Sequence, residues 1–127
     1  MRPIVLLAIN ARWTHTALGA RRLLANLGGL RERAELVEKT VTDRAVDIAE
    51  AVLDRDPAIL GLGVYVWNAA LCAEVVAMVK ALRPDLPVVL GGPEVICRDD
   101  LPAVAALADH VIAGEGEVVF KEVCERL

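Results

Sequence analysis

Residues 86–94, LPVVLGGPE, and residues 110–117, HVIAGEGE, decide the fold, because each is an apolar run that ends in a glycine-rich turn. The runs are Leu86–Leu90 and His110–Ala113, and each turn leads into a helical pattern. Glycines at a strand end let a ligand press against bare backbone, and the next helix offers free N–H groups to anionic parts of that ligand. The two turns therefore predict a binding edge on a parallel sheet, in a domain that holds a large, phosphate-containing cofactor.

The composition favours the same class of fold. The chain has 127 residues, enough for one domain with its own core. Apolar residues make up 56% of it but aromatic residues only 3%, so Val, Leu, Ile and Ala must build the core, as in a parallel sheet covered by helices. Three of the four aromatic rings, Trp13, Tyr65 and Trp67, fall at or just after the expected strand ends.

The charge, the cysteines and the apolar runs exclude several classes of protein. The net charge is −4 and no basic run exceeds two residues, which argues against a nucleic-acid partner. Cys72, Cys97 and Cys124 are far apart and form no CxxC pair, so we interpret them as reduced cytosolic thiols that fill helices or loops. The stretch Ile4–Ile9 is too short to span a membrane or to form a signal peptide. We expect a cytoplasmic protein with no nucleic-acid or membrane partner.

Strand and helix patterns alternate along the whole chain. Strands are expected at Ile4–Ile9, Ala34–Lys39, Ile59–Tyr65, Pro87–Leu90 and His110–Ala113. Helices are expected at Thr16–Leu27, from an Asp43 cap to Asp56-Pro57, from an Asn68 cap to Pro84, around Asp100–Leu107, and over Glu117–Arg126. Right-handed crossovers place every strand's carboxyl end along one edge. We predict a three-layer, doubly wound α/β domain of flavodoxin-like (Rossmann-like) topology. Its five-stranded parallel sheet has the order 2-1-3-4-5, with the ligand near the switch point between the first and third strands.

Five loops face this predicted edge: residues 10–15 (NARWTH), 40–42 (TVT), 65–68 (YVWN), 91–94 (GGPE) and 114–117 (GEGE). The absence of a GxxxxGK[ST] sequence excludes a P-loop. Gly61 and Gly63 lie within a strand and lack the third glycine of a dinucleotide-binding motif, so we interpret them as packing residues. A phosphoacceptor receiver domain would need acidic residues where Asn10 and Tyr65 stand.

The ordered set of these loops resembles the N-terminal cobalamin (B12)-binding domain of radical SAM enzymes. The resemblance covers essentially the whole chain, and its most specific part is the pair GGPE and GEGE with a short helix between them. It implies that residues 1–127 form one cofactor module that binds cobalamin at the carboxyl edge of the sheet. It also implies a C-terminal radical SAM catalytic domain in cis, with a [4Fe–4S] cluster and S-adenosylmethionine.

The motif CxxxCxxC, which holds the cluster in such enzymes, is absent from this chain. We therefore expect the chain alone to be non-catalytic. The complete protein would carry out methyl transfer or a radical rearrangement, with this module orienting the cofactor.

The resemblance also assigns residues to the cofactor. Gly91 and Gly92 would let the nucleotide tail of cobalamin pass close to the backbone, and the fifth loop would contact the tail or the corrin amides. The rings of Tyr65 and Trp67 would wall the corrin, or else form a plug against the catalytic domain. The full predicted set is Asn10, Arg12, Trp13, Thr14, His15, Tyr65, Val66, Trp67, Gly91, Gly92, Pro93, Glu94, Gly114, Glu115 and Gly116.

The first loop departs from the pattern of many cobalamin domains. They carry DxHxxG after the first strand, and its His ligates cobalt from below. Here Trp13 stands two positions before His15, and Gly19 comes one place too late. The resemblance therefore implies base-off cobalamin without a protein His ligand, whose lower face meets Trp13, Arg12 or a water.

Two other functions remain open from the sequence. A flavodoxin-like FMN carrier could use Thr14 and Thr16 for a phosphate and two tryptophans for the flavin ring, although the first loop lacks the hydroxyl and glycine density of a phosphate loop. A regulatory or interaction domain with a degenerate pocket is the third possibility. The colour of the purified protein separates them: pink or orange for cobalamin, yellow for flavin, none for a degenerate pocket.

Overall fold

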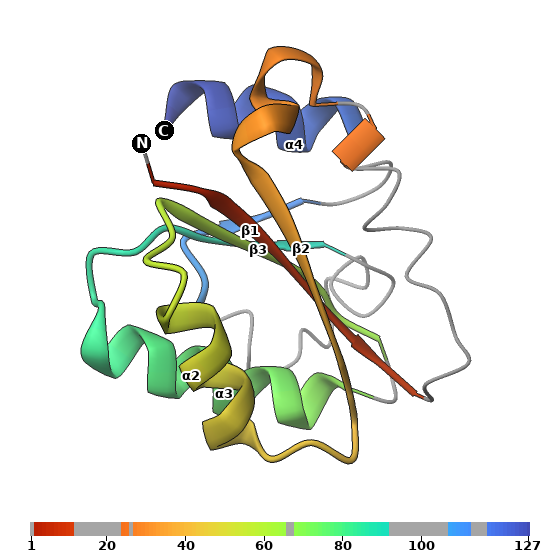
Figure 1. Cartoon of the computed structure of the whole chain (residues 1–127), viewed down its shortest axis with the longest axis vertical. Coiled ribbons are helices and arrows are strands. Elements are labelled where there is room, and N and C mark those ends of the chain that lie inside the picture. Colours follow the sequence, from red (N-terminus) through yellow and green to blue (C-terminus); the bar gives the residue numbers. More distant parts are fainter. Residues whose placement is uncertain (1, 12–23, 26, 66–67, 92–106, 113–116) are drawn as a thin grey trace.

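The computed structural model shows strands alternating with helices from β1 to β4, and a further strand and helix toward the C-terminus (Figure 1). It describes residues 2–11, 24–25, 27–65, 68–91, 107–112 and 117–127. The strands are β1 (Ile4–Asn10), β2 (Ala34–Thr40), β3 (Ile59–Gly63), β4 (Val88–Gly91) and β5 (His110–Val111). The helices are η1 (Gly28–Arg33, a 3-10 helix), α2 (Ala45–Leu53), α3 (Ala69–Leu82) and α4 (Glu117–Arg126).

The five strands form one sheet in the order β2-β1-β3-β4-β5, and every neighbouring pair is parallel. This confirms the predicted topology. β1 lies in the middle of the β2-β1-β3 group, because the chain moves outward to β2 and then returns to β3 on the other side of β1. The switch point expected of a doubly wound sheet therefore lies between β1 and β3.

Helices cover both faces of the sheet (Figure 1). Along β1 the side chains alternate: Val5, Leu7 and Ile9 belong to one core cluster, and Ile4 and Leu6 to the other. The first cluster includes buried residues of α2 and α3, and we call this side the α2/α3 face. The second includes residues of α4 and the segment before η1, and we call this side the α4 face: Leu24, Leu27, Phe120 and Cys124.

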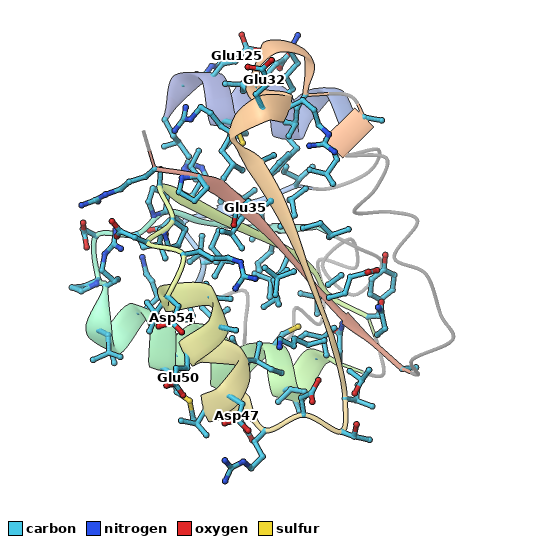
Figure 2. All side chains as sticks on the ribbon, viewed as in Figure 1. Glu32, Glu35, Asp47, Glu50, Asp54 and Glu125 are labelled. Atoms are coloured by element: carbon cyan, nitrogen blue, oxygen red, sulfur yellow. The ribbon has the colours of Figure 1, made fainter. Side chains whose placement is uncertain are left out.

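Charged side chains stay outside these two cores. Figure 2 shows the labelled carboxylates on η1, α4, β2 and α2, and all of them are exposed: Glu32, Glu35, Asp47, Glu50, Asp54 and Glu125. Within the described part of the chain, the buried polar side chains are those of Thr40 and Asn68, at 2% and 1% exposure. Thr40 ends β2, and Asn68 contacts the carboxyl ends of β1 and β3 through the Ile9 and Gly63 carbonyls, so these buried polar groups gather at the edge predicted to bind a ligand.

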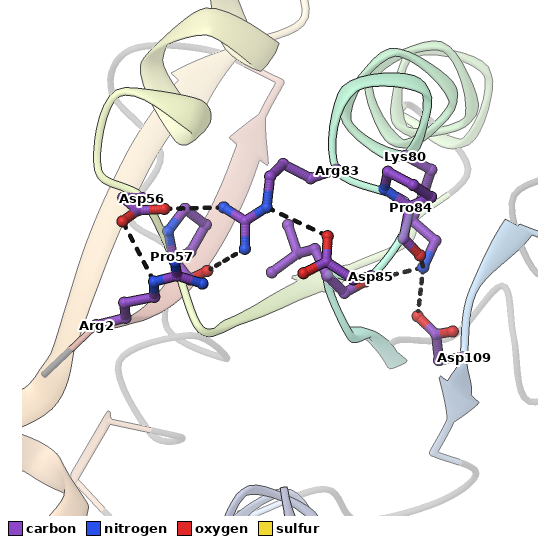
Figure 3. A network of polar contacts seen from close by, with 9 residues as sticks. Arg2, Asp56, Pro57, Lys80, Arg83, Pro84, Asp85 and Asp109 are labelled. Atoms are coloured by element: carbon purple, nitrogen blue, oxygen red, sulfur yellow. Dashed lines mark hydrogen bonds and ion pairs between the residues drawn. The ribbon is translucent and has the colours of Figure 1, made fainter.

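Ion pairs tie together the loops at the opposite, amino edge of the sheet (Figure 3). Asp56 accepts from Arg83 at 2.9 Å and pairs with Arg2 at 3.3 Å. Asp109, just before β5, accepts from Lys80 at 2.9 Å and from the Val88 N–H at 2.8 Å. The second group of contacts joins α3, β4 and the start of β5, and so holds the outermost strand in register.

Replacing Asp109 with Asn should lower the free energy of unfolding by about 1 kcal/mol at neutral pH. Partial burial works against the charged form of Asp109. The hydrogen bonds from Lys80 and the Val88 N–H, with the charges of Lys80 and His110, outweigh it and hold the pKa of this carboxyl below its usual value. The stabilisation that the ionised Asp109 contributes to the fold is therefore present above the unfolded-state pKa of this carboxyl and is lost as the pH falls through its folded-state pKa.

Urea unfolding of the wild type and Asp109→Asn at pH 7 and about pH 3 tests this linkage. The difference in free energy of unfolding between the wild type and Asp109→Asn should be smaller at the acidic pH than at neutral pH. Asp85→Asn is the matched control, because Asp85 is 73% exposed and pairs with Arg83 at only 3.4 Å. A gap that is the same at both pH values would contradict the role of the ionised Asp109.

Several local expectations need correction. Asp43 is not the N-cap of α2: that position is Arg44, which makes no side-chain cap, and the Asp43 carboxylate turns back to accept the Thr40 N–H at 2.8 Å. β3 ends at Gly63, so Tyr65 lies beyond the strand. Asn68 does precede α3, but its side chain does not cap the helix.

Other elements agree with their predicted ranges or lie beyond the description. α3 and α4 have the predicted bounds, and β2 is an edge strand, as its mixed polar pattern indicated. Gly28, with a φ of 60°, begins the 3-10 helix η1, which directly follows the end of the predicted helix at 16–27. Most of the predicted helix at 16–27, and the one around 100–107, lie outside the described residues.

Candidate cofactor-binding edge

The carboxyl edge of the sheet gathers residues from four strands. Asn10 ends β1 and Thr40 ends β2, and the two are paired in register. Gly91 ends β4, and Tyr65 follows β3 by two positions. A further hydrogen bond, from the Val41 N–H to the Asn10 carbonyl at 2.9 Å, holds the first two strand ends together. The described members of the predicted site therefore lie along one edge, as the parallel topology requires.

Two paired glycines lie on the α4 face at this edge. Gly63 and Gly91 are register partners on β3 and β4. Their neighbours Leu62 and Leu90 belong to the α2/α3 core, so alternation turns both glycine positions toward the α4 face. A Cβ on Gly91 would meet no described atom within 4 Å. Among the described residues, no side chain therefore covers the end of β4 at Gly91.

The side chain of Tyr65 covers the Gly63 position. A Cβ placed on Gly63 would lie 3.2 Å from Tyr65 Cε2, so the tyrosine ring packs directly over the glycine. Tyr65 itself is half-buried. The glycine at position 63 therefore allows an aromatic ring to pack against the end of β3, beside its register partner Gly91 on β4.

Gly61, two positions earlier on β3, serves packing alone. A Cβ there would come within 2.9 Å of both Leu6 Cδ2 and Phe120 Cε1, and both side chains are buried. The absence of a side chain on Gly61 lets α4 lie close to the sheet. This agrees with the interpretation of Gly61 and Gly63 as packing residues rather than a dinucleotide-binding motif.

The sequence did not reveal the role of Asn68, which is a central residue of this edge. Its Nδ2 donates to the Ile9 carbonyl at 3.0 Å and to the Gly63 carbonyl at 3.3 Å, and its Oδ1 accepts the Tyr65 N–H at 2.8 Å. Ile9 is 59 positions away in sequence, so no local pattern could reveal the contact. The one available signal was an amide side chain directly after a predicted strand and loop.

A second polar group closes the turn after β2. The hydroxyls of Thr40 and Thr42 are hydrogen-bonded at 2.7 Å, and Asp43 Oδ2 lies 3.5 Å from Thr40 Oγ1. The Thr40 hydroxyl is therefore engaged within its own turn. We assign this group a structural role, since its polar atoms satisfy one another.

The remaining predicted residues cannot be placed. Asn10, Tyr65 and Gly91 are described, and they lie at the carboxyl edge. The others fall outside the described residues: Arg12, Trp13, Thr14, His15, Val66, Trp67, Gly92, Pro93, Glu94, Gly114, Glu115 and Gly116.

The two cysteines that the structure describes are core residues. Cys72 and Cys124 are buried in α3 and α4. Burial raises the pKa of the Cys72 thiol to about 12 and that of Cys124 to about 11, so both remain protonated at neutral pH. Among the described residues, no group of three His, Cys, Asp or Glu side chains is arranged to hold a metal ion. These two thiols fill helices, as expected; Cys97 lies outside the description.

Comparison with known families shows which family the chain belongs to. Residues 4–124 match the family model described as the B12 binding domain. The chain belongs to the B12-binding domain family. The match runs from β1 into α4, so it includes every strand of the sheet. The resemblance of the loops to a cobalamin-binding domain is therefore confirmed.

Two methyltransferases are similar to part of this B12-binding domain. The first is 2-(S-pantetheinyl)-carbapenam-3-carboxylate methyltransferase of Streptantibioticus cattleyicolor, 42% identical over 74 residues, which are 57% of this chain. The second is the cobalamin-dependent radical SAM methyltransferase TokK of Streptomyces tokunonensis, 37% identical over 81 residues, which are 60% of this chain. In each relative the matching segment is only 11% of the length, so this chain corresponds to a small part of either protein.

Solved structures share the fold of this B12-binding domain. A cobalamin-binding protein from Desulfitobacterium hafniense superimposes with a TM-score of 0.66 at 24% identity, over 98% of this chain and 58% of the other. An activated DrrB receiver domain gives a TM-score of 0.62 at 16% identity, over 99% and 97%. At these identities the likeness concerns the fold alone. Within the described ranges, no helix is both long and apolar enough to cross a membrane.

Proposed function

We propose that this B12-binding domain holds cobalamin at the carboxyl edge of its sheet, with the nucleotide tail passing over the α4 face beside β4. The observation that carries the proposal is the Gly91 position at the end of β4, where a Cβ would meet no described atom within 4 Å, beside its register partner Gly63 under the Tyr65 ring. Family membership supplies the identity of the cofactor.

The described residues fit such a cofactor. Corrin amides and a tail phosphate need backbone donors and acceptors at close approach, and a bare glycine at the end of β4 allows it. An aromatic ring such as Tyr65 offers apolar contact area to a large ring system. Asn10, Tyr65 and Gly91 would hold the cofactor together with the predicted residues of the other loops. When bound, cobalamin supplies a cobalt centre for group transfer that no side chain can replace.

The broken first-loop motif supports binding without a protein histidine. His15 lacks the aspartate two positions before it and the glycine three positions after it that accompany a ligating histidine in the related pattern. We propose that the bound cobalamin is base-off and that His15 does not reach cobalt.

Electron paramagnetic resonance of the reduced, Co(II) form of bound cobalamin tests this ligation. A nitrogen ligand below cobalt splits each cobalt line, so the wild type and His15→Ala should both give unsplit lines and matching absorption spectra. Splitting that disappears in His15→Ala would establish histidine as the ligand. Splitting that persists in His15→Ala would mean that the cofactor's own base stays bound. Either result would contradict the proposal.

The domain would act as the cofactor module of a larger enzyme. Two relatives carry the word methyltransferase in their names, one of them also cobalamin-dependent and radical SAM, and each is much longer than the segment that matches. We propose that a radical SAM catalytic domain in cis, C-terminal to this module, holds the [4Fe–4S] cluster and S-adenosylmethionine and completes a methyl transfer. In this division of roles the 127-residue chain binds and orients cobalamin and performs no reaction by itself.

A further inference from the structure

The strongest unassigned feature of the chain is the buried Asn68 at the switch point between β1 and β3. Its side chain is 1% exposed and makes three hydrogen bonds to backbone groups of three different segments. Two bonds go from Nδ2 to the carbonyls of Ile9 and Gly63, and one comes to Oδ1 from the Tyr65 N–H. Few side chains could satisfy this arrangement, because it needs two donors and one acceptor within one planar group.

These bonds join parts of the edge that the sheet leaves unconnected. The register pairing of β1 with β3 ends at Leu7 and Leu62, before the strands reach their last residues. The bond from Asn68 to Ile9 takes over beyond that point, next to Asn10. One amide therefore spans the switch point and continues the connection between the two strands where the cofactor is proposed to bind.

The same amide fixes the start of the third loop. The Tyr65 N–H donates to Asn68 Oδ1, and the Asn68 N–H donates to the Tyr65 carbonyl at 3.1 Å. Residue 65 is thus held at both of its backbone polar groups by residue 68. The Val64 N–H donates to the Gly91 carbonyl at 2.8 Å, which ties this loop to the bare end of β4.

If Asn68 only stabilised α3, its side chain would cap that helix. The Asn68 side chain makes no capping bond to the helix that follows it, although it occupies the capping position. The helix is held to residue 68 by its backbone instead, through the Cys72 N–H and the Asn68 carbonyl at 2.8 Å. The three hydrogen bonds of the Asn68 side chain go instead to the strand ends and to Tyr65.

We propose that Asn68 is a positioning residue for the cobalamin site, which sets the place of Tyr65 relative to Asn10 and Gly91. This inference rests on the proposed function. Asn68 need not touch the cofactor; it acts through Tyr65 and the end of β1. Without its amide, the third loop loses its link to β1, and the surface that receives the corrin is no longer formed in advance.

The test compares Asn68→Ala with Val79→Ala in the 127-residue chain. Val79 is fully buried in the same helix, near the end away from the edge, so its truncation destabilises the fold without touching the loop. Two measurements are made on each variant: amide hydrogen exchange without cofactor, and hydroxocobalamin binding with the visible circular dichroism of the bound corrin. The second readout reports the surroundings of the corrin and does not depend on the fraction folded.

In Asn68→Ala the amides of residues 64–68 should exchange about a hundredfold faster than in wild type, while those of α2 and β2 change no more than in Val79→Ala. Cobalamin affinity should fall about tenfold or more, with an altered corrin dichroism. Val79→Ala should bind with wild-type affinity and dichroism.

The inference is overturned if loop exchange in Asn68→Ala matches Val79→Ala, or if the loop loosens while affinity and dichroism stay wild-type. If the wild-type chain itself binds no cobalamin, the proposed function fails and the cofactor part of this inference falls with it. Exchange measured without cofactor then still decides whether Asn68 holds the loop.

Discussion

Gly91→Leu should lower the affinity for cobalamin by about a hundredfold or more while the chain keeps its fold. A side chain at this position projects from the end of β4 onto the α4 face, where the cofactor tail is proposed to pass. Its first carbon would meet no described atom within 4 Å, so the leucine does not clash with the described core. Replacing a glycine also lowers the conformational entropy of the unfolded chain, and this effect favours the folded state.

Gly29→Leu is the matched control for this variant. A Cβ on Gly29 likewise meets nothing within 4 Å, but the residue lies in η1, before β2 and away from the carboxyl edge. Circular dichroism should show both variants folded, and absorbance titration should show that only Gly91→Leu has lost cobalamin. Wild-type affinity in Gly91→Leu would mean that the bare end of β4 is not where the cofactor lies.

Gly61→Ala should cost about 2 kcal/mol or more of folding free energy, the largest stability effect expected from adding a single methyl group to this chain. The added carbon would lie 2.9 Å from Leu6 Cδ2 and from Phe120 Cε1. Neither neighbour can move freely, because Leu6 is 1% exposed and Phe120 is 2% exposed. Part of the cost therefore falls on the packing of α4 against the sheet. Urea unfolding with an unchanged slope measures the loss.

A double mutant identifies the cause. Phe120→Leu removes the ring edge that the new methyl group would strike, so Gly61→Ala should cost less in that background than in the wild type. Gly91→Ala supplies the comparison for adding a methyl group to a strand-end glycine with free space, and it should leave stability nearly unchanged. Strict additivity of Gly61→Ala and Phe120→Leu would show that the ring is not the obstacle.

The topology was predictable because it depends on features that recur at short range. Apolar runs of strand length alternate with amphipathic helices, and the short connections allow only right-handed crossovers between parallel strands. The mixed pattern of Ala34–Lys39 marked an edge strand, and the apolar run at Ile59–Tyr65 marked an inner one. The glycine-rich sequence that begins at Gly91 also predicted a binding edge from a local pattern, and that edge stays a prediction.

The sequence did not show which backbone groups two short polar side chains would contact. Asn68 after a predicted loop looks like an ordinary helix cap, and only the fold brings the Ile9 carbonyl to its amide. Asp43 before a helix looks like a cap as well, yet its carboxylate accepts a hydrogen bond from the Thr40 N–H at the end of β2. In both cases a short polar side chain had two possible backbone partners, and the three-dimensional arrangement selected the one on the strand side.

The most direct test is an absorbance titration of the 127-residue chain with hydroxocobalamin, followed by desalting. One cobalamin per chain should stay with the protein and show a base-off spectrum, and Gly91→Leu should emerge colourless from the same column. A wild-type chain that is folded by circular dichroism but releases all of its colour would contradict cobalamin binding at this edge.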